Sequence, residues 1–176
     1  MQTVLDDFEV IPTRASVGAE IRGIDLSQPV GDETFERIER TFDRFGVIFF
    51  RNQTISPSQQ IEFGQRFGTP DINYNSNDAG LEGHPEIFLI SNIVEGNREI
   101  GVPKVGATWH TDMCYAEIPP RATLLYALEV PVLNGLTLGD TAFANTAAAW
   151  DALPLEMQDA LRDLRANFDF QGRWRN

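Results

Sequence analysis

DETFERIERTFDRFGVIFF, residues 32–50, carries the two patterns that decide the fold of this chain. Four apolar residues recur at spacings of three and four and so share one face of a helix: Phe35, Ile38, Phe42 and Phe45. Asp32 is the expected N-cap of this helix, and Gly46 is its expected end. The apolar run 47–50 has the length and character of a strand buried on both faces. The stretch therefore predicts a helix followed directly by a buried strand.

Helical and strand-like patterns continue on both sides of this stretch. Residues 8–26 predict an extended region with a turn at Gly23. Ser56-Pro57 opens a second helix, because serine caps helices and proline is tolerated at the first helical position. Further strands are expected at 87–90, 107–115, 123–130 and 168–170, further helices from Asn145 or Thr146 through Trp150 and from Pro154 to about Arg165, and polar loops at 69–85 and 95–106. This mixture indicates an α+β domain with a predominantly antiparallel sheet.

The length and net charge of the chain indicate how many domains it has and which partners it does not bind. With 176 residues and 42% apolar content, the chain has room for one substantial core, so we expect a single domain over residues 1–176. The 26 acidic and 14 basic residues give a net charge of -12, which repels nucleic acids and anionic lipid surfaces. We therefore expect neither a nucleic-acid partner nor a membrane partner.

Cysteine usage and the N-terminus predict a cytoplasmic protein. Cys114 is the only cysteine, which excludes an internal disulfide framework and a thiolate zinc cluster and fits a reducing compartment. Residues 1–10 carry Asp6, Asp7 and Glu9 where a signal peptide would need basic residues followed by an apolar run. No segment approaches the length of a membrane span.

Candidate chemistry is concentrated in WHTD, residues 109–112. Positions i and i+2 of a strand project to the same face, so His110 and Asp112 can converge on one cation. Two histidines and one carboxylate form the facial triad of non-haem iron oxygenases, but a second histidine is missing here. His84, which lies at an expected turn, is the only other histidine and a poor candidate ligand. By itself the tripeptide is a weak signal, because such a pair is more often a surface or hydrogen-bonded pair.

A set of motifs along the whole chain strengthens the metal interpretation. In sequence order they are GAEIRGIDL at 18–26, FGVIFFR at 45–51, FGTP at 67–70, WHTD at 109–112, prolines at 119, 120 and 131, GDT at 139–141 and ALP at 152–154. This set resembles the taurine dioxygenase-like family of Fe(II)- and 2-oxoglutarate-dependent dioxygenases. The resemblance implies a double-stranded β-helix (jelly-roll) core with flanking helices, incomplete at its C-terminal end.

The resemblance also implies roles for single residues. His110 and Asp112 fall on the first two iron ligands, and Thr141 falls on the threonine whose hydroxyl contacts a carboxylate of 2-oxoglutarate. Candidate substrate-binding residues are Asn73, Tyr74 and Met113, together with Tyr115, although aromatic and methionine side chains are more often core residues. The implied reaction uses dioxygen to hydroxylate a small organic substrate, such as a sulfonate or carboxylate, with succinate and CO2 as co-products. The expected assembly is a homo-oligomer.

The absence of a second histidine leaves alternatives open. Family members supply it far downstream, followed by an arginine that pairs with the distal carboxylate of 2-oxoglutarate. No histidine follows His110, and four arginines lie too early for that role: Arg162, Arg165, Arg173 and Arg175. The expected explanation is a missing C-terminal part. The alternatives are a catalytically inactive relative that acts as a binding protein, and an acidic domain whose His-X-Asp is coincidental.

A second departure concerns the substrate. Asn73 and Gly106 stand where taurine-oxidising members carry a histidine and an asparagine. The stretch 132–138 is also longer than in those members. Taurine itself is therefore not the expected substrate.

Overall fold

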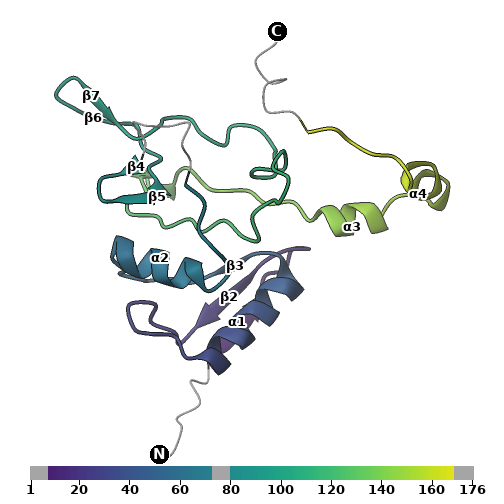
Figure 1. Cartoon of the computed structure of the whole chain (residues 1–176), viewed down its shortest axis with the longest axis horizontal. Coiled ribbons are helices and arrows are strands. Elements are labelled where there is room, and N and C mark those ends of the chain that lie inside the picture. Colours follow the sequence, from purple (N-terminus) through teal and green to yellow (C-terminus); the bar gives the residue numbers. More distant parts are fainter. Residues whose placement is uncertain (1–7, 73–79, 169–176) are drawn as a thin grey trace, which may run out of the picture. The chain divides into compact units, whose positions relative to one another are not determined.

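The structure, a computed structural model, describes residues 8–72 and 80–168. These residues form two compact units, whose elements are labelled in Figure 1. Unit 1 consists of the described parts of Met1–Thr54 and Leu125–Ala166, and unit 2 of those of Ile55–Leu124 and Asn167–Asn176. The expectation of a single domain stays a prediction.

A three-stranded sheet and one helix form the core of unit 1. β1 (Glu9–Pro12) pairs antiparallel with β2 (Ala19–Arg22), and β2 pairs parallel with the short strand β3 (Ile48–Phe49). α1 (Asp32–Phe45) connects β2 to β3 and contacts β3 (Figure 1). The buried apolar side chains come from the sheet, the helix and the segments beside them: Phe8, Ala19, Ile21, Leu26, Phe35 and Ile38. The periodic helix predicted from residues 32–50 is thus confirmed.

Both ends of α1 follow local sequence signals. The N-cap is Gly31, which provides no side-chain cap, so the prediction of Asp32 as N-cap is wrong by one residue. Asp32 lies in the first turn instead, where its negative charge is favourable near the helix N-terminus. At the other end Gly46 has a φ of 70°, a left-handed conformation that glycine adopts without steric cost. Its N–H donates to the carbonyl of Phe42 at 2.7 Å, which closes the helix.

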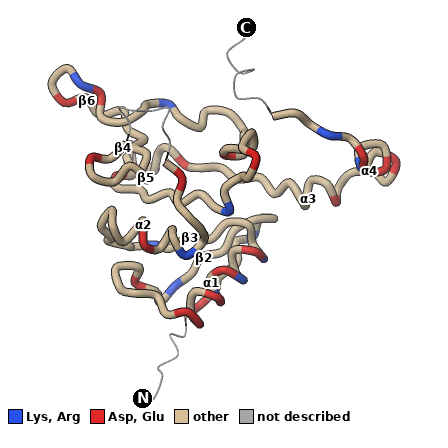
Figure 2. Tube along the Cα trace, viewed as in Figure 1, with Lys and Arg blue, Asp and Glu red and all other residues tan. Residues whose placement is uncertain are grey.

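Basic and acidic residues alternate along α1 in the sequence, and Figure 2 marks both kinds on its backbone. The Arg37 guanidinium donates to the carbonyl of Phe8 at 2.8 Å and lies 4.0 Å from the centroid of the Phe8 ring. Arg40 forms an i,i+4 ion pair with Glu36 at 3.5 Å. Arg37 therefore fixes the chain just before β1 against the helix through both a hydrogen bond and a cation–π contact.

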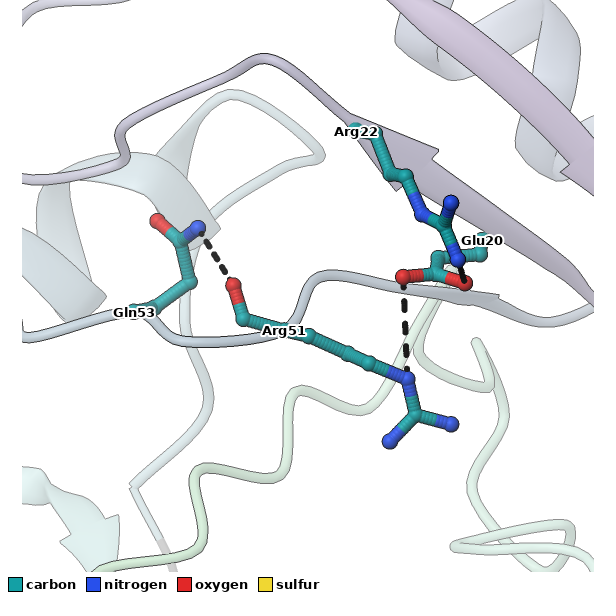
Figure 3. Close-up of polar contacts among 4 residues, drawn as sticks. All are labelled: Glu20, Arg22, Arg51 and Gln53. Carbon is teal, nitrogen blue, oxygen red and sulfur yellow. Dashed lines mark hydrogen bonds and ion pairs between the residues drawn. The ribbon is translucent and has the colours of Figure 1, made fainter.

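Glu20 is a buried carboxylate in the sheet, with 8% of its surface exposed. It accepts a hydrogen bond from Arg22 at 2.8 Å and forms an ion pair with Arg51 at 3.6 Å (Figure 3). The Arg22 hydrogen bond, helped by the charges of both arginines, holds the pKa of Glu20 below its ordinary value of 4.5. The Gln53 amide donates to the Arg51 carbonyl of its own segment at 3.0 Å (Figure 3). It also ties this segment to the one after β2, because it donates to the Ile24 carbonyl at 3.0 Å and accepts from the Leu26 N–H at 2.8 Å.

Unit 2 begins with α2 (Pro57–Gln65), whose N-terminus is closed by a capping box. The Ser56 hydroxyl accepts from the Gln59 N–H at 3.3 Å, and the Gln59 side chain accepts from the Ser56 N–H at 2.7 Å. The predicted start of this helix is confirmed. A hairpin of β4 (Gly80–Leu81) and β5 (His84–Phe88) follows, and β5 contacts α2.

β6 (Ile93–Glu95) and β7 (Arg98–Ile100) form a second hairpin of unit 2. Directly after β7 the backbone of Gly101 passes close to that of Leu89. Gly101 follows β7 with a φ of 84°, and a Cβ added there would lie 2.7 Å from the carbonyl oxygen of Leu89. The same carbonyl accepts a hydrogen bond from the Val102 N–H at 2.9 Å. Only glycine fits here without displacing the Leu89 backbone.

A two-residue hairpin joins β8 (Val132–Leu133) to β9 (Leu136–Thr137) in the later part of unit 1. Asn134 and Gly135, at its tip, have φ values of 52° and 80°. Positive φ at both central residues is typical of a type I′ turn, for which Asn-Gly is the favoured sequence.

α3 (Thr146–Asp151) and α4 (Leu155–Leu161) are the last described elements. Asn145 is the N-cap of α3, as one of the two predicted caps, and its side chain accepts from the Ala148 N–H at 3.0 Å. The Asn145 amide also donates to the Ser16 carbonyl at 2.7 Å. One side chain thus starts α3 and ties it to the loop between β1 and β2.

Large apolar side chains are exposed over much of residues 90–168. Leu128, Leu155 and Leu136 are 81%, 76% and 70% exposed. The apolar residues of this region therefore lack the dense packing found around α1. No helix in the described ranges is both long enough and apolar enough to cross a bilayer.

Several strand predictions are wrong. Residues 47–50 give only β3, which is half-buried rather than buried, because it lies at the edge of its sheet. Residues 107–115 and 123–130 have irregular backbone, since no ladder partner lies beside them within the described residues. β5 spans 84–88 rather than 87–90, and the expected loops 69–85 and 95–106 contain β4 and β7. α4 ends at Leu161 rather than near Arg165.

The expected fold class is confirmed in its coarse form. Helices and strands are mixed, and among the described strand pairs only β2–β3 is parallel. The described strands form four small sheets and do not close a double-stranded β-helix. That part of the expectation stays a prediction. Of the strand expected at 168–170 only Phe168 is described, and it is not in a strand.

Candidate active site

His110 and Asp112 face each other, as the spacing of the motif predicts. His110 Nε2 lies 3.0 Å from Asp112 Oδ1. The backbone that brings them together is not the expected strand: residues 109–111 are irregular, and a turn begins at Asp112. Met113, inside this turn, has a φ of 48°, and its carbonyl accepts from the Ala116 N–H at 2.9 Å. The convergence is therefore produced by a turn rather than by strand alternation.

The other ring nitrogen of His110 is held by the backbone. Nδ1 lies 2.7 Å from the Thr108 carbonyl oxygen, so it carries a hydrogen and donates it. In the neutral ring Nε2 then presents a lone pair to the Asp112 carboxylate. Two such acceptors 3.0 Å apart need a positive charge between them, either a proton or a metal ion.

The spacing of this pair fits a divalent metal ion. Donor atoms at about 2.1 Å from a metal and at right angles to each other lie about 3.0 Å apart. His110 Nε2 and Asp112 Oδ1 have this separation, and a backbone carbonyl on the second ring nitrogen is the usual support of a metal-binding histidine. The pair could therefore provide two adjacent ligands of one octahedral ion, and its 3.0 Å separation is also that of an ordinary hydrogen bond.

Thr123 contacts the candidate site and was not predicted as a site residue. Its hydroxyl donates to Asp112 Oδ2 at 2.8 Å. The two carboxylate oxygens of Asp112 thus have different partners, one facing His110 and the other held by Thr123. Thr123 lies eleven positions after Asp112, with Pro119-Pro120 between them, so no sequence periodicity predicts the contact.

The pair is accessible to solvent in the described structure. The side chains of His110 and Asp112 are 42% and 47% exposed. Gly106 lies beside the imidazole: a Cβ added there would be 3.9 Å from His110 Cε1. Its φ of 77° favours glycine, so the space next to the ring stays open.

The other predicted site residues lie in unit 1, next to the His110–Asp112 pair, or outside the described residues. Thr141 lies in unit 1, in an exposed irregular segment that follows Gly139, whereas the His110–Asp112 pair belongs to unit 2. Met113 directly follows Asp112 and is half-buried, and Tyr115 is 43% exposed. Asn73 and Tyr74 are outside the described residues. The roles of all these residues stay predictions.

His84 takes part in a contact that is separate from the candidate site. Its Nε2 lies 3.2 Å from the hydroxyl of Ser58 on α2, and its Nδ1 lies 3.4 Å from the Glu82 carbonyl. Nowhere in the described ranges do three or more His, Cys, Asp or Glu side chains form a group that could hold a metal ion. Among the described residues, the candidate site therefore has two protein ligands.

A shallow polar cleft of about 380 Å³ lies in unit 1, and none of its lining residues belongs to the candidate site. Its lining residues are Ile24, Asp25, Ser27, Asn52, Gln53 and Thr54. The Asp25 carboxylate accepts from the Ser27 N–H at 2.9 Å, and its hydrogen bonds to Ser27 lower the pKa of Asp25. The Asp25 carboxylate at the edge of the cleft is thus already engaged by hydrogen bonds within the chain.

Comparison with known protein families gives a match over nearly the whole chain. The model of the family described as "Taurine catabolism dioxygenase TauD, TfdA family" matches residues 9–175. The chain belongs to this family. The match includes all the motifs from 18–26 to 152–154, so the resemblance predicted from them is confirmed.

Individual proteins of known name are similar to this chain, two of them over most of its length. The alpha-ketoglutarate-dependent 2,4-dichlorophenoxyacetate dioxygenase of Cupriavidus pinatubonensis is 32% identical over 165 residues, covering 88% of this chain and 56% of the relative. The alpha-ketoglutarate-dependent sulfate ester dioxygenase of Pseudomonas putida is 34% identical over 170 residues, covering 92% and 50%. The crystal structure of a taurine dioxygenase from Burkholderia xenovorans matches at 31% identity with a TM-score of 0.45, covering 50% of this chain and 31% of that one. The chain spans about half the length of the curated relatives it matches.

Proposed function

We propose that this chain provides the first two iron ligands of an Fe(II)- and 2-oxoglutarate-dependent dioxygenase that hydroxylates a small organic anion. The observation that carries the proposal is the 3.0 Å separation between His110 Nε2 and Asp112 Oδ1, with Nδ1 held by the Thr108 carbonyl. The TauD/TfdA family match supports the reaction class. Both relatives named above are dioxygenases, which gives no support to the alternative of an inactive binding protein.

Each residue has a physical role in this proposal. His110 binds the ion through Nε2, and Asp112 binds it through Oδ1 while its negative charge reduces the net charge of the site. The Thr141 hydroxyl donates to a carboxylate of 2-oxoglutarate. When bound, the iron and 2-oxoglutarate would supply the redox chemistry: 2-oxoglutarate would lose CO2 and take one oxygen atom of dioxygen to become succinate, and the other oxygen atom would enter the substrate as a hydroxyl group. The third ligand and an arginine for the distal carboxylate of 2-oxoglutarate come from polypeptide outside these 176 residues, within a jelly-roll fold.

The proposed substrate carries a carboxylate, sulfonate or sulfate ester group. The names of the family and of the two relatives support this class, because they refer to taurine, to 2,4-dichlorophenoxyacetate and to sulfate esters. Gly106 leaves open space next to the imidazole of His110. We propose that this space admits a substrate bulkier than taurine, with Met113 at the edge of the same pocket.

Metal binding by the chain tests the proposal directly. Mn(II) can replace Fe(II) in air, and electron paramagnetic resonance measures the free ion during a titration. We expect weak binding by the wild-type chain, because only two protein ligands are present, and a loss of at least tenfold in affinity for His110→Ala and for Asp112→Asn. His84→Ala is the matched control, since it removes the other histidine of the chain. Equal affinity in all four proteins would refute the proposed site.

An anaerobic titration with Fe(II) and 2-oxoglutarate tests the reaction class. The chelate of iron and 2-oxoglutarate gives a visible charge-transfer band. We expect no band from the 176-residue chain and a clear band from a polypeptide that continues into a segment with a histidine and then an arginine. A longer polypeptide of that kind that binds Mn(II) but gives no band would refute the dioxygenase assignment and leave only a metal site.

A further inference from the structure

The two oxygens of the Asp112 carboxylate are held differently. Oδ1 faces His110 Nε2 at 3.0 Å, and Oδ2 accepts a hydrogen bond from the Thr123 hydroxyl at 2.8 Å. Asp112 is about half exposed, so surrounding side chains do not pack its carboxylate into one orientation. Two contacts therefore fix the plane of the carboxylate, with one oxygen toward the imidazole and the other toward the Thr123 hydroxyl, and of the two only the Thr123 contact holds an oxygen away from the imidazole.

The orientation of this carboxylate decides how many positions of a metal ion it occupies. A carboxylate can bind a cation through one oxygen or through both. Binding through both oxygens would require Oδ2 to turn toward the ion and to give up the hydrogen bond from Thr123. A hydroxyl donor on Oδ2 thus favours binding through Oδ1 alone.

The number of occupied positions matters for the reaction proposed above. An octahedral ion has six positions, of which a facial triad uses three and chelating 2-oxoglutarate uses two. Dioxygen needs the remaining one. If both oxygens of Asp112 were bound, this last position would be filled before dioxygen arrived.

We propose that Thr123 is a positioning residue that restricts Asp112 to binding the metal through one oxygen and so keeps a coordination position open. The inference rests on the proposed function and adds to it a residue outside the iron ligands. Thr123 acts only through Asp112, and its effect requires the hydroxyl rather than the shape of the side chain. Thr123→Val removes the hydroxyl at nearly constant volume, and Thr123→Ser retains it.

The first test needs no metal. In the metal-free chain, nuclear magnetic resonance gives the chemical shift of the Asp112 carboxyl carbon and the Hα–Hβ couplings, which report the side-chain rotamer. We expect one rotamer in the wild type and in Thr123→Ser. For Thr123→Val we expect averaged couplings and a carboxyl shift close to that of a free aspartate. Thr69→Val, at an exposed threonine of unit 2, is the matched control and should leave both values unchanged.

The second test counts the water molecules on bound Mn(II) from water-proton relaxation. If Thr123 keeps Asp112 at one oxygen, Thr123→Val should lose one bound water relative to the wild type, and Thr123→Ser should keep it. A purely structural role for Thr123 would not change this count in a folded protein. An unchanged water count in Thr123→Val, or an unchanged Asp112 rotamer, would overturn the inference.

The two tests separate this inference from the proposed function. If the wild type binds Mn(II) no better than His110→Ala, the metal site is wrong as proposed. The metal-free measurement then still decides whether Thr123 fixes the Asp112 carboxylate. If Mn(II) binds as expected and the Thr123 variants behave alike, the metal site stands and the role of Thr123 is refuted.

Discussion

Gly101 offers a sharp test of the backbone that leads to the candidate site. A Cβ at this position would lie 2.7 Å from the Leu89 carbonyl oxygen, and the same oxygen accepts the Val102 N–H at 2.9 Å. The φ of 84° adds a second penalty, since left-handed backbone costs an L-residue about 1–2 kcal/mol. Displacing the Leu89 carbonyl weakens a hydrogen bond whose net contribution is about 1 kcal/mol. Gly101→Ala should therefore lower the free energy of unfolding by about 2–3 kcal/mol.

The neighbouring hairpin provides the matched control for this substitution. Gly96 also has a left-handed backbone, with a φ of 64°, but a Cβ added there meets no atom within 4 Å. Gly96→Ala should cost only the conformational part, about 1–2 kcal/mol. Urea denaturation of both variants measures the difference, and amide hydrogen exchange at Val102 should be faster in Gly101→Ala alone. Equal losses of stability in the two variants, with Val102 equally protected, would refute the close-contact argument.

Substitutions at three further positions probe the framework of the two units. Ile38 is completely buried, so Ile38→Ala should destabilise by about 2–5 kcal/mol and Ile38→Val by about 0.5–1.5 kcal/mol in urea denaturation; equal effects would contradict a packed core here. Ser56→Ala removes the cap of α2 and should cost about 1 kcal/mol, with faster amide exchange in the first turn, whereas a normal exchange pattern would argue against the capping box. The pKa of Glu20 is lowered in the folded protein, first by its hydrogen bond from Arg22, so its stabilising contribution is complete above the ordinary value of 4.5 and is lost as the pH falls through the folded value. Glu20→Gln should therefore flatten the decline in stability between neutral and acid pH, and an unchanged decline would exclude this ion pair as a cause.

The helices could be predicted from sequence because their signals are local. The periodic apolar residues of α1, the stop at Gly46 and the cap at Ser56 all act within one or two turns of the chain. Strands depend on partners that sequence does not place. Residues 122–126 alternate between half-buried and exposed as a strand would, yet no partner strand lies beside them among the described residues. The Asn134-Gly135 hairpin was missed although its dipeptide is a strong local signal.

In the candidate site, too, the local feature could be predicted from the sequence and the contact with a distant residue could not. The two-residue spacing of His110 and Asp112 was sufficient to predict that they converge, but the cause is a turn with Met113 in left-handed backbone rather than a strand. The contact from Thr123 could not be predicted, because it depends on how the chain returns after Pro119-Pro120. The spacing of His110 and Asp112 can be read from the sequence, whereas the hydrogen bond from Thr123 to Asp112 depends on the tertiary fold.

The exposed leucines of residues 125–168 have a practical consequence for handling the protein. Apolar side chains such as Leu128 and Leu155 attract one another between molecules, while a net charge of -12 keeps the molecules apart. Added salt screens that repulsion beyond about 10 Å at 0.1 M but leaves the apolar attraction intact. Colloidal stability should therefore fall as the ionic strength rises, so dilute buffer rather than saline is the better medium for concentrating the protein.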